Sequence, residues 1–164
     1  MYEIGDKVVY PMHGAGIIEG IEVKEILGEK RQYYILNFAM GGMRVMVPTK
    51  NVKELGMRDI IPDTDINKVV SILKSPYGTL PDNWNKRYRL NLEKIKTGDI
   101  YEVANVVRDL MIRDRDKGLS SAEKKMLNNA RQILISELCL STSTEEEEIS
   151  SLIDNITLHE TASE

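Results

Sequence analysis

The chain changes from strand-forming to helix-forming sequence near residue 61, and this change limits the folds that it can adopt. Before it, short runs rich in Val, Ile and Tyr are separated by turn signals at Pro11 to Gly16 and at Gly41-Gly42. These runs predict four strands, over residues 7–10, 16–26, 32–39 and 43–47. Short strands that close on themselves are typical of a small SH3-like or Tudor-like β-barrel.

Beyond residue 61 the apolar residues recur at helical spacing. Asp99 with Glu102 and Ser120 with Glu123 have the spacing of a capping box, which marks two helix starts. Five helices are predicted: over residues 65–73 and 81–96, from Asp99, from Ser120, and over residues 144–158. The fold class is therefore α+β. We expect an SH3/Tudor-like barrel over residues 1–60, a compact all-α domain over residues 61–158 and a frayed acidic tail over residues 159–164.

Three apolar stripes on these helices are expected to form the core of the all-α domain. They comprise Ile100, Val103, Val107, Leu110 and Met111; Leu127, Ala130, Leu134 and Leu138; and Ile149, Leu152, Ile153 and Ile156. The single cysteine, Cys139, falls beside the second stripe and is interpreted as a small buried hydrophobe rather than a nucleophile.

Charge is unevenly distributed along the chain. Residues 141–164 carry seven acidic and no basic side chains, so the first 140 residues have a net charge of +3 within a total of −4. Residues 81–131 contain twelve basic against eight acidic side chains. An anionic partner is therefore expected to meet the middle of the chain, although a solvated helical surface often has a similar balance.

The sequence offers little for catalysis or metal binding. It has one cysteine and two distant histidines, His13 and His159, and it lacks a Gly-rich phosphate loop and a dinucleotide fingerprint. His13 lies in a Gly-rich turn and is interpreted as a turn residue rather than a general base. We therefore expect no enzymatic activity, no cofactor, no metal and no small-molecule substrate.

The apolar runs and the first residues indicate where the protein acts. No apolar run approaches the roughly 20 residues of a membrane span, and no secretory signal pattern is present. A single cysteine fits a reducing compartment. The cytoplasm is therefore the expected location, with no membrane partner.

The stretch LPDNWNKRYR, residues 80–89, is the most informative part of the sequence because it places the only tryptophan, Trp84, at a predicted helix start. Its basic neighbours are Lys86, Arg87 and Arg89, and another helix start carries Lys124 and Lys125. Basic side chains bind phosphates, and an exposed aromatic ring stacks on a base or pushes against a base step. A lone tryptophan is also a common core anchor, and both interpretations stay open at this point.

Six motifs follow one another in order over residues 1–140. They are GDKVVYPMHGAG at Gly5–Gly16, VPTKN at Val47–Asn51, NWNKRYR at Asn83–Arg89, VANVVRDL at Val103–Leu110, GLSSAEKKML at Gly118–Leu127 and ARQIL at Ala130–Leu134. With these motifs the chain resembles the CarD (CdnL) family of bacterial transcription regulators. The N-terminal module of that family is similar to the polymerase-interacting domain of the transcription-repair coupling factor.

The resemblance implies that the barrel docks on the RNA polymerase β subunit and that the helical domain contacts promoter DNA at the upstream edge of the melted region. Trp84 would enter the minor groove at that fork, hinder re-annealing and so stabilise the open promoter complex. The DNA-binding residues would be Trp84, Lys86, Arg87, Arg89, Lys124 and Lys125. A monomer that associates with the nucleoid through polymerase is expected.

The resemblance places the polymerase-binding surface on Lys24 and on one strand. The strand residues are Arg44, Val45, Met46, Val47 and Pro48. Lys24 stands where the family often has arginine, and Met46 stands where another basic residue is usual. Arg44 lies two residues before Met46, on the same strand face, and is the candidate for the missing charge. Edge pairing of this strand, through backbone hydrogen bonds, is a second way to bind.

Two other functions stay open. SH3-like barrels commonly bind RNA, so the first alternative is an RNA- or ribosome-binding module that acts without polymerase. The second is a peptide reader with an aromatic cage for a modified lysine, built from Tyr10, Tyr33, Tyr34 and Phe38. Strand alternation places Tyr33 on the opposite face from Tyr34 and Phe38, so only part of such a cage is expected.

Overall fold

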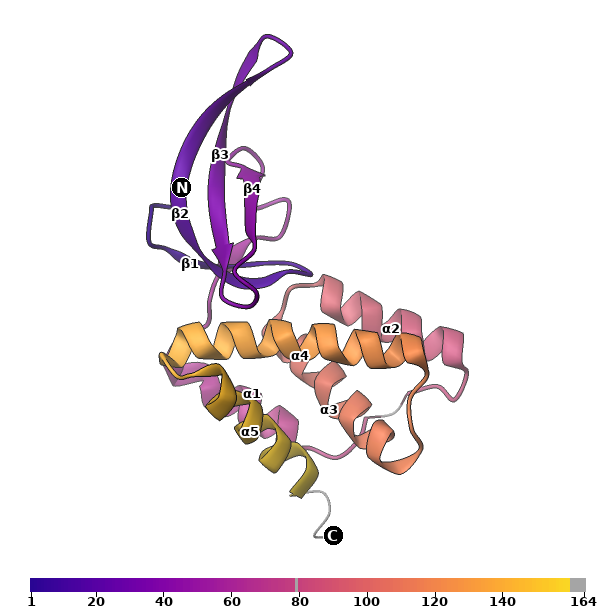
Figure 1. Cartoon of the computed structure of the whole chain (residues 1–164). Helices are drawn as coiled ribbons and strands as arrows, with labels where there is room; N and C mark the ends of the chain where they lie inside the picture. The colour runs from indigo at the N-terminus through magenta and orange to yellow at the C-terminus, as the bar shows by residue number, and fades with distance from the viewer. Residues whose placement is uncertain (79, 160–164) are drawn as a thin grey trace.

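A computed structural model describes residues 1–78 and 80–159, in which five strands are followed by five α-helices (Figure 1). The strands are β1 (Lys7–Tyr10), β2 (Gly14–Ile26), β3 (Glu29–Phe38), β4 (Arg44–Pro48) and β5 (Arg58–Asp59). The helices are α1 (Ile66–Lys74), α2 (Trp84–Lys96), α3 (Ile100–Asp116), α4 (Ser121–Thr142) and α5 (Glu146–Asp154). A 3₁₀ turn at Asp63–Asp65 precedes α1, and a π-helical turn at Asn155–His159 follows α5. The α+β class is confirmed. Residues 160–164, in the tail predicted to fray, lie outside the described residues.

The five strands form one antiparallel sheet in the order β4-β3-β2-β1-β5. The expected closure into a barrel is corrected, because β4 and β5 lie at opposite edges and the sheet is open. β5, which the sequence did not predict, has only two residues and pairs only with Val8 and Val9 of β1. A strand this short gives the sheet no second partner for β4, so the outer edge of β4 stays unpaired within residues 1–78 and 80–159.

β2 and β3 extend well beyond their neighbours. Residues 23–26 of β2 pair with residues 29–32 of β3, whereas β1 and β4 pair only nearer the base of the hairpin. The turn between them consists of Leu27 and Gly28, both with positive φ (53° and 79°), as in the tight two-residue turns that continue the strand twist. The result is a two-stranded arm that projects away from the helices (Figure 1).

A small apolar core lies within the sheet region. It comprises Val8, Ile18, Tyr34, Leu36, Phe38, Val47, Val52 and Met57. Two of the four proposed cage residues, Tyr34 and Phe38, belong to this core and are almost fully buried. The aromatic cage of a peptide reader is therefore excluded, because these rings are not accessible to a ligand.

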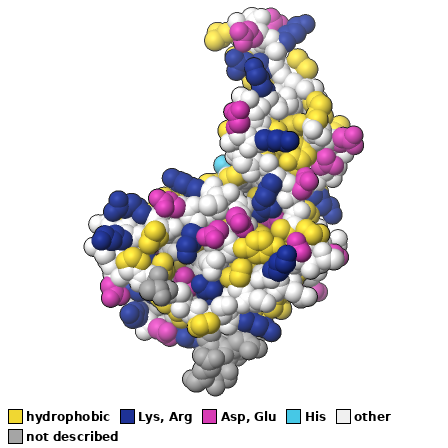
Figure 2. All heavy atoms as spheres, turned by 180° about the vertical axis from the view of Figure 1, so that it is seen from behind, with side chains coloured by type: hydrophobic (Ala, Val, Ile, Leu, Met, Phe, Trp, Pro, Cys, Tyr) yellow, Lys and Arg dark blue, Asp and Glu magenta, His cyan; other side chains and the backbone are white. Residues whose placement is uncertain are grey.

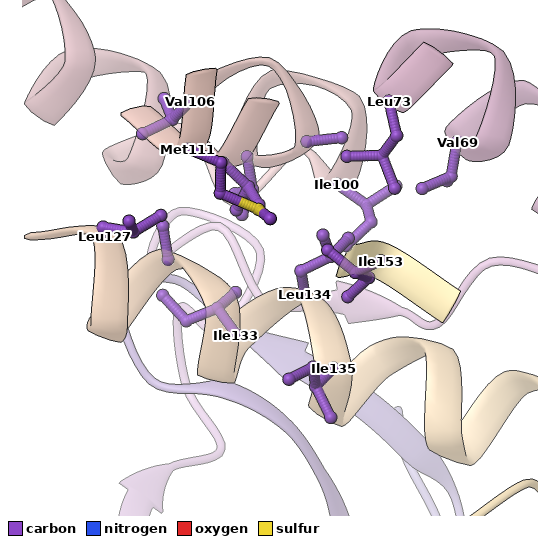
Figure 3. Packing of buried hydrophobic residues seen from close by; sticks show 14 of the residues in the cluster. Val69, Leu73, Ile100, Val106, Met111, Leu127, Ile133, Leu134, Ile135 and Ile153 are labelled. Carbon is purple, nitrogen blue, oxygen red and sulfur yellow. The ribbon is translucent and has the colours of Figure 1, made fainter. Parts of the chain in front are cut away.

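A larger core lies among the helices, and α3 is at its centre, in contact with α1, α2 and α4. Figure 3 shows Leu73 of α1, Ile100 of α3, Leu134 of α4 and Ile153 of α5 meeting in this core. The stripes predicted on α3 and α4 are buried throughout. The last stripe is correct for Ile149 and Ile153 of α5 and for Ile156 in the π-helical turn after it, but wrong for Leu152, which is 40% exposed.

Helix α4 joins the two regions, since the base of the sheet rests on it while α1, α3 and α5 lie on its other side (Figure 1). The backbone N–H of Ala15 donates to the Ser136 hydroxyl at 2.9 Å. The guanidinium of Arg58 donates to both carboxylate oxygens of Glu137 at 2.7 and 2.8 Å, and also to the carbonyl of Gly98. Because Glu137 is buried, these bonds compensate for the loss of its hydration and fix the sheet on the helix.

Gly14 tests this junction, because its φ is +93° and a Cβ there would lie 2.6 Å from the Ser136 hydroxyl oxygen. We expect Gly14→Ala to lower the free energy of unfolding by about 1 kcal/mol for backbone strain and about 2 kcal/mol more for overpacking. Gly5→Ala is the matched control, since Gly5 has a φ of +96° and a Cβ there would meet no atom within 4 Å. Urea unfolding of both variants measures the difference, and equal losses would show that the junction is not tightly packed.

Candidate nucleic-acid interface

Helices α2 and α4 begin side by side, although they are distant in sequence. Asn83 caps α2, and its Oδ1 accepts a hydrogen bond from the backbone N–H of Lys86 at 3.1 Å. Ser120 caps α4, and its hydroxyl accepts from the backbone N–H of Glu123 at 3.2 Å. Side chains at these positions reach from one helix start to the other, which brings the two predicted basic segments together.

Trp84, the first residue of α2, is 40% exposed, so the core-anchor interpretation does not hold. Its indole N–H donates to the Ser120 hydroxyl at 2.9 Å. Its ring stacks on Tyr88, one helical turn later, with centroids 5.3 Å apart and planes 19° apart. A large aromatic ring is thus held in place on the surface while much of it faces solvent.

A buried ion pair lies beneath the ring. Arg87 donates to both carboxylate oxygens of Glu123, at 2.9 and 3.1 Å, and the two residues are only 3% and 1% exposed. Burial opposes ionisation of Glu123, but the hydrogen bonds and charge of Arg87, with a contribution from Ser120, hold the pKa of Glu123 below its ordinary value. The hydrogen bond to Glu123 also raises the pKa of Arg87.

Arg87 therefore differs from its expected role. Its Nη1 group also donates to the backbone carbonyls of Asp82 at 3.1 Å and Pro81 at 3.4 Å, so four of the five N–H donors of the guanidinium are used within the protein. In this structure it is not placed to bind a phosphate. Its position shows instead that it holds the start of α2 against the start of α4.

The other four predicted cations lie near the starts of the same two helices. Lys86, Arg89, Lys124 and Lys125 are all exposed. Figure 2, seen from behind, shows Lys and Arg side chains gathered along the left edge of the helical region, which is the end at which α2 and α4 begin. The structure thus leaves five of the six predicted DNA-binding residues exposed in the first turns of α2 and α4 and buries the sixth, Arg87.

The side chains of β4 alternate as predicted. Arg44, Met46 and Pro48 are exposed, whereas Val45 is partly buried. Val47 points into the sheet core and is almost fully buried, so its side chain cannot meet a partner, which corrects its expected part in docking. Arg44 forms an exposed ion pair with Glu19 at 3.1 Å, and a pair of this kind costs little to exchange for another.

The free edge of β4 also offers its backbone. Phe38 N–H donates to the Met43 carbonyl and Thr49 N–H donates to the Gln32 carbonyl, which fixes the β3–β4 ladder. Because bonded residues alternate in an antiparallel ladder, the backbone groups of Arg44 and Met46 point away from β3. Lys24, the remaining predicted docking residue, is exposed on the projecting arm, where it lies opposite Arg31 in the register of β2 and β3.

The two other residues considered for chemistry, His13 and Cys139, have ordinary structural surroundings. His13 is exposed in a turn and stacks near Tyr10 and Phe38, with centroids 5.0 and 5.7 Å away. Burial, with nearby Glu146 and Glu145, raises the pKa of the Cys139 thiol, which keeps it protonated.

Within residues 1–78 and 80–159, no group of three side chains suited to a metal ion occurs. No helix in the same part of the chain is long and apolar enough to cross a membrane.

Both regions of the chain match families of transcription regulators rather than families of enzymes. Residues 2–61 match the CarD-like/TRCF RID domain, a polymerase-interaction domain, and residues 68–154 match the CarD C-terminal domain. The chain is also 46% identical, over 138 residues, to a Bacillus subtilis (strain 168) protein named "Putative transcription factor YdeB". That match spans 84% of this chain and 90% of the relative. The chain belongs to the CarD family, and the resemblance seen in its motifs is confirmed.

Sequence reasoning missed the network beneath Trp84. Ser120 and Glu123 have capping-box spacing, and the predicted helix start is correct, but the Glu123 carboxylate bonds to the Ser120 hydroxyl and to Arg87. Tyr88, four residues after Trp84, was the available signal for the stacked ring, because residues at this spacing are neighbours on a helix.

The Arg87–Glu123 pair predicts a pH dependence of stability. Because the folded pKa of Glu123 lies below its ordinary value of 4.5, the pair stabilises the protein above that pH and loses its contribution as the pH falls through the folded pKa. Glu123→Gln leaves Arg87 buried without a counter-ion, and we expect a loss of about 3 kcal/mol at pH 7. Urea unfolding at pH 7 and below pH 4 should show the difference from wild type shrinking.

Glu29→Gln is the control for this prediction, because Glu29 pairs with Arg31 on the exposed arm. Its effect on stability should stay within about 0.5 kcal/mol at either pH. A Glu123→Gln loss that does not change with pH would contradict the assigned ionisation.

Proposed function

We propose that this protein docks on the RNA polymerase β subunit and stabilises the open promoter complex through minor-groove contact of Trp84 at the upstream fork of the bubble. One observation carries the proposal: the only tryptophan is exposed yet immobilised by Ser120 and Tyr88, beside four exposed cations. A fixed apolar ring next to phosphate-binding groups is the arrangement that opens or props a base step. Membership of the CarD family supports the same function.

The two regions divide the work in this proposal. Residues 1–60 bind polymerase, through the outward backbone of β4, the side chains of Arg44 and Met46, and Lys24 on the arm. Residues 61–158 bind DNA, with Lys86, Arg89, Lys124 and Lys125 on phosphates. The protein then acts as a monomer in the cytoplasm, at the nucleoid, and performs no chemistry of its own.

The size of the effect follows from linkage. A protein shifts the closed–open equilibrium only by the difference between its affinities for the two states. Phosphate contacts are available in both states, whereas a groove already widened at the fork is available only in the open one. A difference of about 1.4 to 2.8 kcal/mol gives about 10- to 100-fold more open complex, which suits a modulator of initiation.

The lifetime of the open complex tests this proposal. With purified polymerase and a bacterial promoter, we expect the protein to lengthen the lifetime, and Trp84→Ala to remove most of that increase, about tenfold, while polymerase binding persists. Leu152→Ala is the matched control, because Leu152 is also 40% exposed but lies on α5. The open complex formed with the Leu152→Ala protein should last as long as the one formed with wild type.

Two results would contradict the proposal. An unchanged lifetime with the wild-type protein at low salt would exclude the open-complex role. Binding to RNA without polymerase would then favour the RNA- or ribosome-binding alternative.

The phosphate contacts predict a salt dependence. On log–log axes, the affinity of the protein for promoter DNA should fall linearly with salt concentration, and Lys124→Gln should reduce the slope by about 0.9 if one phosphate contact is lost. Lys68→Gln is the control, because Lys68 is also a charged and exposed lysine but lies on α1. Parallel lines for wild type and Lys124→Gln would remove Lys124 from the DNA-binding set.

A further inference from the structure

We infer that Ser120 is a positioning residue for Trp84: its hydroxyl fixes the direction of the indole ring and thereby sets how well the protein holds the open complex. The inference rests on the proposed function of Trp84 and extends it to a residue on a different helix. Ser120 itself does not need to touch DNA for this role.

The hydrogen bonds of Ser120 show that its hydroxyl is fully used. A serine hydroxyl has one donor and two acceptor sites. Its oxygen accepts from the Trp84 indole N–H at 2.9 Å and from the Glu123 backbone N–H at 3.2 Å, and it donates to the Glu123 carboxylate at 3.2 Å. With all three sites occupied, the hydroxyl cannot rotate, so the acceptor presented to the indole has a fixed direction.

The acceptor is itself anchored from below. The Glu123 carboxylate that orients the Ser120 hydroxyl is buried and held by two hydrogen bonds from Arg87. Arg87 belongs to α2, the same helix as Trp84. The four residues therefore form a closed loop of contacts, and motion of the indole against α4 would have to break at least one of them.

Tyr88 limits the remaining freedom of the ring. Stacking on Tyr88 fixes the plane of the indole, whereas the bond to Ser120 fixes its rotation within that plane. These two restraints are independent, and a ring that has already lost its rotational freedom loses less entropy on entering a groove. Removing only the hydroxyl should thus loosen the ring without removing it.

Because the chain contains one tryptophan, spectroscopy of the indole reports on this site alone. In the ¹⁵N-labelled full chain we expect Ser120→Ala to move the single indole N–H signal upfield and to speed its exchange with solvent, and Ser120→Thr to restore both. Ser120→Ala also removes a helix cap, so Asp99→Ala is the control: Asp99 caps α3 by accepting from the Tyr101 N–H, away from Trp84. The Asp99→Ala protein should keep the wild-type indole signal.

The second measurement is the open-complex lifetime with polymerase. Ser120→Ala should shorten it about two- to tenfold, the range that one hydrogen bond supplies, and should have no further effect in a Trp84→Ala background. Asp99→Ala should leave the lifetime unchanged, and Ser120→Thr should restore it.

The outcomes separate this inference from the proposed function. An indole signal that Ser120→Ala does not change overturns the inference. The inference is also overturned if Ser120→Ala changes the indole signal but leaves the open-complex lifetime at its wild-type value. If Trp84→Ala nevertheless shortens the lifetime, the proposed function still stands. If Trp84→Ala itself has a wild-type lifetime, the proposed function fails and the inference falls with it.

Discussion

Two buried carboxylates on α4 fix the arrangement of the whole molecule. Glu123, at the start of the helix, holds Arg87 of α2, and Glu137, farther along, holds Arg58 of β5. At about 1.5 Å of rise per residue they lie about 21 Å apart along the helix axis. A buried ion pair adds little net stability compared with apolar residues, but breaking one is costly, so each pair strongly favours one geometry. The distance between the sheet and the Trp84 surface is therefore set by a single helix that is anchored near both ends.

This arrangement explains which parts of the structure could be predicted from the sequence. The buried stripes of α3 and α4 follow from local spacing, and the helix starts at Asp99 and Ser120 follow from local capping. The ion pairs are contacts across long stretches of chain, and a single sequence carries no signal for them. The charge of Arg87 alone suggests a phosphate contact, and only the fold shows that this charge is neutralised by Glu123. The spacing of Leu152 predicts a core position, but the buried face of α5 runs through Ile149 and Ile153 and leaves Leu152 at its edge.

The open form of the sheet could not be predicted either, because it also depends on pairing between distant parts of the chain. The sequence predicts four strands with nearly correct positions, but closure depends on the length and pairing of β5, whose two residues give no periodic signal. The consequence matters for function, because an open sheet leaves the backbone of β4 accessible. Edge pairing draws its affinity mainly from backbone groups, so it tolerates changes of side chain. An uncharged Met46 is compatible with the proposed docking of β4 for this reason.

The two proposed binding surfaces therefore differ in their tolerance of mutation. Docking by β4 depends on a backbone row that most substitutions leave intact, with Arg44 able to exchange Glu19 for a partner's carboxylate. The Trp84 surface has no such redundancy, since one ring, one hydroxyl and one stacked tyrosine define it. In the proposed mechanism the β4 edge supplies attachment, which acts equally on closed and open promoter, and the fixed ring supplies the difference between them. Only that difference shifts the equilibrium, so the regulatory effect depends on the few contacts that hold the indole in place.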